Sequence, residues 1–274
     1  MRREPLWVLV VQTALLVLVL TVWAVPFLWM LLSSFKAADL IIDPRLVLWF
    51  KPTTEHYRTV FESQNFLRYL LNSVSVSAGT TVLTMLAGTL AAYAISRFQT
   101  GGRIFSYWII FTRLVPPAVL VIPFYLMFRA MGLINTVWAL ILADATISLS
   151  FVVWTMRGFF DEIPTELEEA AAIDGCTRLE ALWRVTLPLV RPGLVATTIF
   201  ALLFTWNEFL YGQTLGIAPS AKTLPVSAGD YVTGYANNWG PVFATGAVIM
   251  VPVLVVVLLL QKQIVRGLTL GAIK

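Results

Sequence analysis

The chain has 274 residues, of which 58% are hydrophobic and only 12% charged, and its formal net charge is +4. Soluble domains carry about 25% charged residues, so this chain has too little charge to cover a surface in water, and lipid must solvate most of it. Nucleic-acid binding is excluded because no basic patch with interleaved aromatic residues is present, and the one cysteine, Cys176, excludes an internal disulfide.

Six apolar segments are long enough to cross a bilayer, which takes about 20 helical residues. They cover residues 6–32, 73–95, 104–128, 137–156, 193–214 and 242–260. The first follows Arg2 and Arg3, as a signal peptide would, but it is too long for a signal core, and we expect it to be retained. The pattern predicts an all-α, polytopic membrane protein in which residues 1–274 form a single transmembrane domain.

The distribution of basic residues predicts the orientation. Six spans place both termini on the same side of the membrane. If that side is the cytoplasm, most of the lysine and arginine residues fall in the inner segments, as is usual for cytoplasmic loops. We therefore expect a multi-pass protein of the cytoplasmic membrane with both termini in the cytoplasm.

The second and third segments differ from plain lipid-facing helices. The second is rich in glycine, serine and threonine, which let helix backbones approach, so we expect it inside the bundle. The third contains Pro116, Pro117 and Pro123, each of which removes a backbone donor, so we expect a kink or a break there. Such a bend either lines a transport path or only improves packing, and the sequence leaves both open.

Residues 54–63 lie outside the spans and fit a short interfacial helix that begins at Thr54. The only histidine, His56, lies within it, and we expect a surface position for this side chain. Without a second histidine or a clear cluster of paired carboxylates, the sequence predicts no metal site and no catalytic residues, so a membrane-embedded enzyme is disfavoured.

The longest inner segment, residues 157–192, begins with a helix signal. Thr165 and Glu168 have the spacing of a capping box, in which each side chain accepts a hydrogen bond from the other residue's backbone. Gly175 is well placed to end this helix after about nine residues, because glycine readily adopts the left-handed conformation of a helix end.

A second helix follows in the same segment. Thr177 and Glu180 form another capping box, and we expect Pro188 to stop the helix at Leu187. From these residues alone, the pair is either a helical hairpin that lies flat on the membrane or a docking element whose first, alanine-rich helix enters a partner's groove.

One pattern in this segment spans twenty residues at fixed spacing. It consists of Glu169-Ala170-Ala171, then Gly175, then Val185-x-Leu187-Pro188. It resembles the EAA loop of ABC-importer permeases, in which isoleucine stands where this chain has valine. The resemblance implies that the first helix docks into a cleft on an ATPase subunit. The implied coupling residues are Glu168, Glu169, Ala170, Ala171, Asp174, Gly175, Leu187 and Pro188.

Other stretches extend this resemblance from about residue 25 onward. They are RYLLNS at 68–73, VPPAVLVIPFY at 115–125, WNEFL at 206–210 and the ending RGLTLGAIK. They resemble the carbohydrate branch of these permeases, in particular the maltose-type second permease subunit, and imply the type I ABC importer permease fold. Ser150 is a departure, because many relatives carry a proline there, so no bend of the fourth span is inferred.

The resemblance implies a permease subunit of an ATP-driven ABC importer for a sugar or a related polyol or glycoside. The chain has no G-x-x-x-x-G-K loop followed by Ser or Thr, so it should bind no cofactor, and ATP and Mg²⁺ would bind to a partner. The implied partners are a second homologous permease subunit, two copies of an ATPase subunit and an extracytoplasmic solute-binding protein. The C-terminal tail, 262–274, would reach towards the ATPase pair. Candidate residues of the translocation path are Asn72, Pro116, Pro117, Asn207 and Glu208.

Three ionisable residues, Arg113, Asp144 and Glu208, fall within or near spans, where charge is costly and is usually functional or paired. One interpretation is that both carboxylates pair with Arg113 or face water in the path. The other is a proton relay, which would make the chain a proton-coupled secondary transporter that needs no ATPase.

Overall fold

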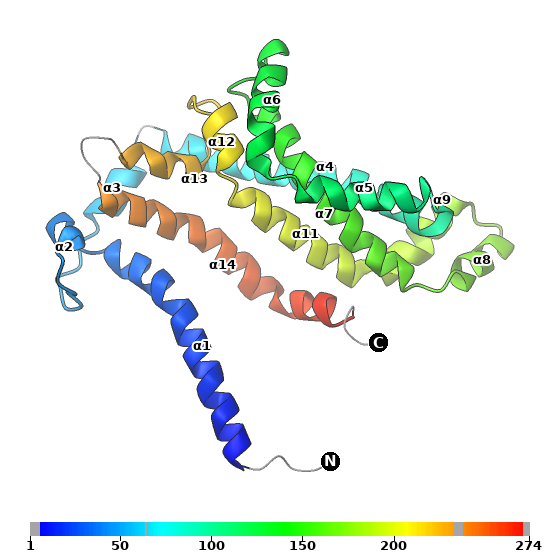
Figure 1. Ribbon diagram of the computed structural model, residues 1–274, viewed down its shortest axis with the longest axis horizontal. Coiled ribbons are helices and arrows are strands. Elements are labelled where there is room, and N and C mark those ends of the chain that lie inside the picture. Colours follow the sequence, from blue (N-terminus) through cyan, green and yellow to red (C-terminus); the bar gives the residue numbers. More distant parts are fainter. Residues whose placement is uncertain (1–5, 64, 233–237, 271–274) are drawn as a thin grey trace. The chain divides into compact units, whose positions relative to one another are not determined.

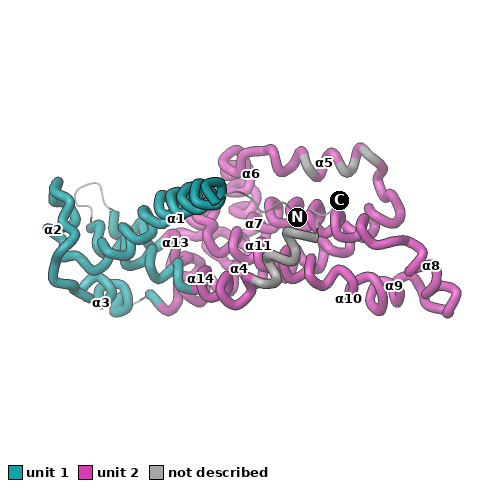
Figure 2. Tube along the Cα trace, turned by 90° about the horizontal axis from the view of Figure 1, so that it is seen from below, with its two compact units in different colours: residues 1–66, 227–251 teal, residues 67–226, 252–274 magenta. Residues whose placement is uncertain are grey.

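The structure, a computed structural model, describes residues 6–63, 65–232 and 238–270, and the elements it forms there are helices (Figure 1). The chain divides into two compact units (Figure 2). Unit 1 comprises Met1–Phe66 and Ser227–Val251, and unit 2 comprises Leu67–Val226 and Pro252–Lys274. The last long helix contributes to both.

Unit 1 is built from the first three helices, a short 3-10 turn and the start of the last helix. These elements are α1 (Leu6–Ser33), α2 (Ala38–Ile42), α3 (Glu55–Phe61), η2 (Ala228–Tyr231) and α14 (Trp239–Leu270). α1 and α14 approach closely, since a Cβ atom on Gly246 would lie 3.0 Å from the sulfur of Met30. Glycine is therefore what allows the two helices to touch at this point.

His56 is buried, so the expected surface position is wrong. Its Nε2 lies 2.8 Å from the carbonyl oxygen of Lys36, whose own ammonium sits 4.0 Å above the ring of Trp29. Gly240 packs directly on the imidazole, and a Cβ atom there would fall within 2.4 Å of three ring atoms. The histidine ties α3 to the turn that follows α1, which is a structural role.

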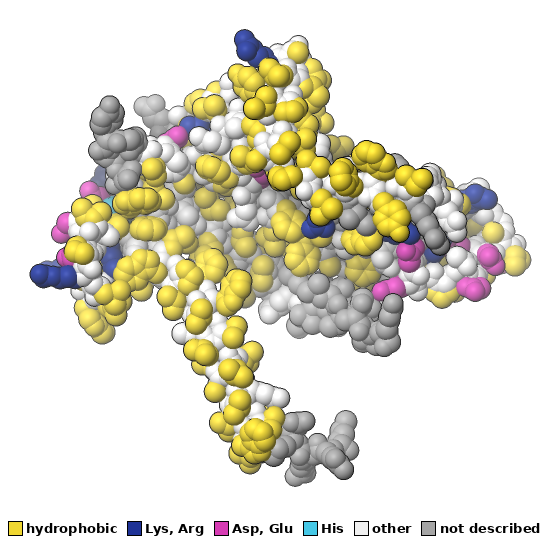
Figure 3. All heavy atoms as spheres, in the orientation of Figure 1, with side chains coloured by type: hydrophobic (Ala, Val, Ile, Leu, Met, Phe, Trp, Pro, Cys, Tyr) yellow, Lys and Arg dark blue, Asp and Glu magenta, His cyan; other side chains and the backbone are white. Residues whose placement is uncertain are grey.

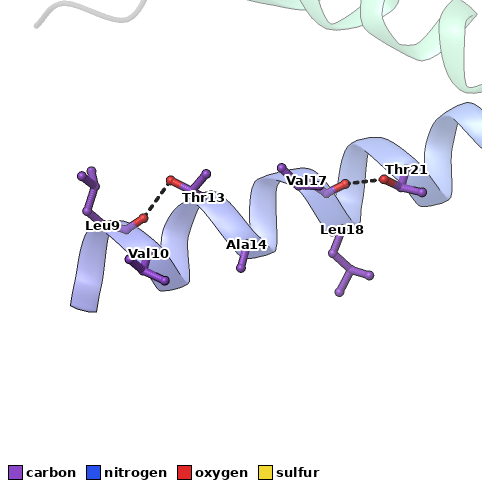
Figure 4. Close-up of a pocket in the computed structure, with 7 residues that line it drawn as sticks. All are labelled: Leu9, Val10, Thr13, Ala14, Val17, Leu18 and Thr21. Carbon is purple, nitrogen blue, oxygen red and sulfur yellow. Dashed lines mark hydrogen bonds between the residues drawn. The ribbon is translucent and has the colours of Figure 1, made fainter. Parts of the chain in front are cut away.

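α1 has the properties of a lipid-facing helix. None of its most apolar 18-residue window is buried. The hydroxyl of Thr13 donates to the carbonyl of Leu9, and that of Thr21 to the carbonyl of Val17, each at 2.8 Å (Figure 4). Both threonines and Ala14 line a shallow, apolar surface along the helix. A helix whose polar groups are satisfied internally is compatible with the hydrocarbon core.

Unit 2 is a helical bundle with short helices at its ends. Its elements are α4 (Phe66–Phe98), α5 (Gly102–Leu114), α6 (Pro117–Ala130), α7 (Val137–Asp161), α8 (Glu166–Ile173), α9 (Arg178–Ala181), the π-helical turn η1 (Leu182–Thr186), α10 (Leu187–Leu189), α11 (Arg191–Trp206), α12 (Leu210–Leu215) and α13 (Leu224–Ser227). α8 and α9 lie together at one end of this unit (Figures 1 and 2).

The expectation that the second span lies inside the bundle is confirmed for α4. Its small residues let α7 approach, since a Cβ atom on Gly88 would lie 2.7 Å from a methyl group of Val152. The hydroxyls of Thr84 and Ser148 lie 3.3 Å apart across the same interface. Close backbones and hydroxyl pairs of this kind hold helices together where lipid offers no hydrophobic driving force.

Two buried clusters form the core of unit 2. The cluster nearer α8 includes Tyr93, Val152, Met156, Phe160 and Leu182. The other includes Val76, Phe128, Leu140, Tyr211 and Leu215. The first cluster joins α4 and α7 to η1, so the loop after α7 is packed against the bundle rather than lying loose.

Candidate membrane-spanning helices occur where the apolar segments predict them. Within the described residues, four helices are long and apolar enough to cross a membrane, and two bent helix pairs raise the number to six if each is one span. The proline-containing third segment is broken rather than continuous, because α5 and α6 meet at 91° across the extended Val115. α7 runs through Ser150 without interruption, and that hydroxyl lies 2.8 Å from the hydroxyl of Thr112.

The fifth segment is shorter than predicted. α11 ends at Trp206, and the chain breaks at Asn207 before the separate helix α12, although the apolar segment continues to residue 214. The break follows from Glu208, whose carboxylate accepts hydrogen bonds from the backbone N–H groups of Tyr211 and Gly212 and so begins a new helix.

Gly193 in α11 provides a test of the close packing between α7 and α11. A Cβ atom there would lie 2.5 Å from the ring of Phe159 in α7, so we expect Gly193→Ala to lower stability by about 1–3 kcal/mol, the usual cost of overpacking. Gly158→Ala is the matched control, because a Cβ atom at Gly158 meets nothing within 4 Å. The apparent melting temperature in mild detergent should fall for the first variant only, and equal values for the two would contradict the close approach of α7 and α11.

Candidate functional site

The candidate site is the hairpin formed by α8 and the helix that follows it. Its first helix begins differently from the prediction. Thr165 has helical backbone angles and its side chain makes no capping hydrogen bond, so the predicted capping box with Glu168 is wrong. The carboxylate of Glu168 points instead to Arg97 at the end of α4, and a stronger, charged partner replaces the backbone N–H as its donor.

The end of α8 agrees with the prediction. Gly175 has φ +88°, in the left-handed region that favours glycine. Its N–H donates to the carbonyl of Ala172, and the N–H of Cys176 donates to the carbonyl of Ala171. These two bonds form a Schellman motif, which satisfies the last carbonyls of the helix and reverses the chain.

The second helix begins as predicted and ends later. Thr177 and Glu180 form the expected capping box, with both reciprocal hydrogen bonds present. Pro188 does not stop the helix, because it follows the π-helical turn η1 and sits in the first turn of α10, where its missing N–H is tolerated. The helix continues to Leu189, and α11 turns away from it by 79°.

Glu168 is held by three donors from two other parts of the chain. Arg97 Nε and the hydroxyl of Thr186 both donate to its Oε1 at 2.8 Å, and the hydroxyl of Tyr93 donates to its Oε2 at 2.9 Å. Arg97 also donates to the carbonyl of Ile163, just before α8, at 3.0 Å. We name Tyr93, Arg97, Glu168 and Thr186 the anchor cluster. Sequence reasoning missed three of its members, because nothing local links a residue of α4 to one 71 positions later.

The anchor cluster changes the acidity of Glu168. Burial of the carboxyl acts to raise its pKa, but the hydrogen bonds from Arg97, Thr186 and Tyr93 and the charge of Arg97 outweigh burial. The pKa of Glu168 therefore lies below its ordinary value of 4.5. A carboxyl whose pKa is lower in the folded state stabilises that state fully above the unfolded pKa, and loses this contribution as the pH falls through the folded pKa.

A pH series on Glu168→Gln tests whether the ionised carboxylate of Glu168 stabilises the fold. At pH 7 we expect the variant to be less stable than the wild type by about 1.5–3 kcal/mol, the usual worth of hydrogen bonds to a charged group. The difference should shrink as the pH falls below 4.5, because only the wild type loses the ionised carboxylate. Melting temperatures of detergent-solubilised protein between pH 7 and 3.5 provide the measurement, and a constant difference over that range would rule out an ionised, anchored Glu168.

The predicted coupling residues divide between two faces of the hairpin. Those that face the bundle are Glu168, Ala171 and Leu187. Those that are exposed are Glu169, Ala170, Asp174, Gly175 and Pro188. Ile173 joins the exposed set with 87% of its surface free, although the sequence reasoning did not single it out. The exposed face is thus acidic with an apolar centre, and Figure 3 shows acidic side chains gathered around α8.

Two of the predicted path residues contact Tyr211: its hydroxyl lies 3.5 Å from the carbonyl oxygen of Pro117, and its backbone N–H donates to Glu208. Asn72 donates to the carbonyls of Pro219 and Lys222 at 3.2 and 2.9 Å, so it holds the loop before α13. Pro116 and Pro117 form the break between α5 and α6, and Pro117 is the first residue of α6. Asn207 is exposed at the end of α11, and Glu208 caps α12. A role in translocation stays a prediction for these residues.

Of the two environments expected for Asp144 and Glu208, pairing with Arg113 is contradicted by the structure, whereas contact with water in the path stays a prediction. Arg113 lies over the ring of Phe151 at 5.2 Å, and none of the ion pairs among the described residues joins it to either carboxylate. Asp144 is 3% exposed, and its Oδ1 has no hydrogen-bond partner in the described part of the chain. Glu208 lies near enough to Asp144 to interact with it electrostatically, and both act on Tyr211. Among the described residues, no hydrogen bond joins Arg113, Asp144 and Glu208 to one another.

The sequence is similar to those of known proteins over most of its length. The chain is 34% identical over 252 residues to the diacetylchitobiose uptake system permease protein DasC of Streptomyces coelicolor, covering 91% of each protein. It is 35% identical over 255 residues to the trehalose transport system permease protein SugB of Mycobacterium tuberculosis, covering 91% of this chain and 92% of that one.

The fold is also similar to that of a solved structure. A chain of a bacterial ABC transporter involved in the import of the acidic polysaccharide alginate superposes with a TM-score of 0.75 at 23% identity, over 92% of this chain and 95% of that one. Residues 84–270 match the family described as binding-protein-dependent transport system inner membrane component. The resemblance to ABC-importer permeases of the carbohydrate branch is thereby confirmed, and the chain belongs to the family of inner-membrane components of binding-protein-dependent transport systems.

Proposed function

We propose that the chain is one permease subunit of an ATP-driven importer for a sugar or a related polyol or glycoside. The observation that carries this proposal is the hairpin of α8, which is fixed to the bundle on one face and exposes an acidic face with Ile173 on the other. Exposed apolar residues rimmed by charge are typical of protein docking surfaces. The names of three relatives refer to the uptake or transport of diacetylchitobiose, sulfoquinovosyl glycerol and trehalose, which supports the substrate class.

The partners follow from the same family. One similar solved structure is an alginate ABC transporter in complex with an oligosaccharide-bound periplasmic protein, which supports a solute-binding protein as a partner here. We propose in addition a second permease subunit and two copies of an ATPase subunit. Both termini would lie in the cytoplasm, where the hairpin of α8 and the tail 262–274 would meet the ATPase pair.

The mechanism proposed is alternating access, driven by the ATPase through α8. A two-state bundle moves from 1:99 to 99:1 only if the driving ligand favours one state by about 5.5 kcal/mol. ATP would close the ATPase dimer, α8 would follow its docking cleft, and the spans would follow α8. The chain itself would bind no nucleotide and catalyse no reaction, and its task would be to convert that movement into an opening on the other side of the membrane.

Reconstitution tests the proposal. The chain would be assembled in proteoliposomes with a candidate second permease, ATPase and binding protein from the same organism, and uptake of a panel of radiolabelled disaccharides would be measured. We expect import of at least one sugar that requires ATP and the binding protein. Uptake that proceeds without the ATPase and responds to a proton gradient would instead support the secondary transporter.

A further inference from the structure

The anchor cluster is the feature that the proposed function does not explain. The side chains of Arg97 and Glu168 are only 6% and 15% exposed, whereas those of Arg184 and Glu180, a neighbouring ion pair in the same hairpin, are 69% and 43% exposed. An exposed pair contributes little to geometry, because both side chains are mobile and solvated. A buried pair with further donors allows one arrangement, since any other would leave a charge unsatisfied.

The anchor cluster joins three segments that are far apart in the sequence. Tyr93 and Arg97 are one turn apart near the end of α4, Glu168 lies in the first turn of α8, and Thr186 lies in η1. The hydroxyl of Thr186 faces Glu168 from the π-helical turn, a rare element that often occurs at functional sites. Glu168 is therefore bonded both to the end of α4 and to the second helix of the hairpin.

Neighbouring ring contacts hold Tyr93 and the end of α4 in place. The ring of Tyr93 packs edge-on against Phe160 of α7, with centroids 5.6 Å apart. The guanidinium of Arg178, at the start of α9, lies 4.9 Å above the ring of Phe98, the last residue of α4. The planar guanidinium of Arg97 donates in two directions, to the carboxylate of Glu168 and to the carbonyl of Ile163. Arg97 therefore orients α8 as well as holding it.

The exposed and the buried faces of α8 have different partners. Glu169 and Ile173 are exposed, whereas the adjacent Glu168 points to α4. If a bound partner displaces the exposed face of α8, the displacement would therefore be transmitted to α4 through Glu168. We propose that Arg97, with Tyr93 and Thr186, is a positioning residue that makes α8 and the end of α4 move as one body. This inference rests on the proposed function, because it names the joint through which that function would act.

The first experiment measures rigidity without any partner. Spin labels at Ile173→Cys and Leu90→Cys, in a Cys176→Ser chain, report the distance between α8 and the exposed side of α4. We expect a narrow distance distribution in the otherwise unchanged chain, a distribution at least about twice as wide in Arg97→Met, and an intermediate width in Arg97→Lys, which keeps the charge but not the planar fork. Arg184→Met is the matched control and should leave the width unchanged. Equal widths in all four chains would overturn the proposal.

The second experiment measures the number of ATP molecules hydrolysed per sugar imported by the reconstituted transporter. We expect Arg97→Met to raise this ratio about tenfold while ATP hydrolysis continues, and Arg184→Met to leave it unchanged. If hydrolysis and uptake fell in proportion, the cluster would only stabilise the fold and the inference would be wrong. If the wild type itself showed no ATP-driven uptake, the proposed function would fail, and the spin-label result would still decide whether Arg97 positions α8.

Discussion

Replacing Glu169 with lysine should abolish ATP-driven uptake without changing the amount or stability of the protein in the membrane. Glu169 is exposed on α8, and among the described residues it forms no ion pair or hydrogen bond through its side chain. Its charge is therefore available to a basic group on the proposed ATPase subunit. A lysine at this position would place two positive charges together, at a cost of several kcal/mol. Since each 1.4 kcal/mol is a factor of ten in binding, we expect uptake to fall by more than about tenfold.

The control for this prediction is Glu162→Lys. Glu162 is another exposed carboxylate, at the end of α7 and outside α8, so its reversal changes the net charge equally but leaves the docking face intact. Uptake and co-purification of the ATPase with each variant provide the measurement. Wild-type uptake in Glu169→Lys, or equal losses in both variants, would show that charge on α8 has no specific role.

Gly175→Leu should have a comparable effect for a different reason. The position has φ +88°, and a Cβ atom there meets nothing within 4 Å, so the substitution strains the backbone and creates no clash. A left-handed conformation costs a residue other than glycine about 1–2 kcal/mol, which the chain would relieve by opening the Schellman motif. Because that motif sets the angle between α8 and α9, we expect uptake to fall about tenfold while ATP hydrolysis continues.

Two further variants separate strain from side-chain size. Asparagine adopts the left-handed conformation more readily, so Gly175→Asn should retain most of the uptake. Gly132 has φ +69° in the turn after α6, with open space around it, so Gly132→Leu brings the same kind of strain away from the hairpin. Equal losses of uptake in the leucine variants at both positions would mean that strain acts through general instability and not through the angle of α8.

Local signals predicted the features that depend on nearby residues. The turn at Gly175 and the capping box at Thr177 depend on residues within a few positions, and both were predicted correctly. The spans depend on the length of apolar segments, which is also readable in the chain. The capping box at Thr165 was wrong because Glu168 has a partner 71 positions earlier, and local spacing contains no information about such a residue.

Other errors have the same origin. His56 is buried because Gly240, far along the chain, leaves room for its ring, and its Nε2 meets the carbonyl of Lys36. The break at Asn207 interrupts a segment whose composition is apolar throughout, because Glu208 starts a new helix. In each case a polar group in lipid or in the core took a hydrogen-bond partner that propensity and hydropathy do not specify.

If α8 transmits movement from an ATPase subunit to the bundle, the two must be in contact, and photo-crosslinking from α8 detects that contact. A benzophenone maleimide on Ile173→Cys, in a Cys176→Ser chain, would be irradiated in membranes that contain the assembled transporter, with Trp138→Cys at the exposed start of α7 as the reference position. We expect an adduct between position 173 and the ATPase subunit, and none from position 138. Adducts of position 173 with lipid alone would contradict this expectation.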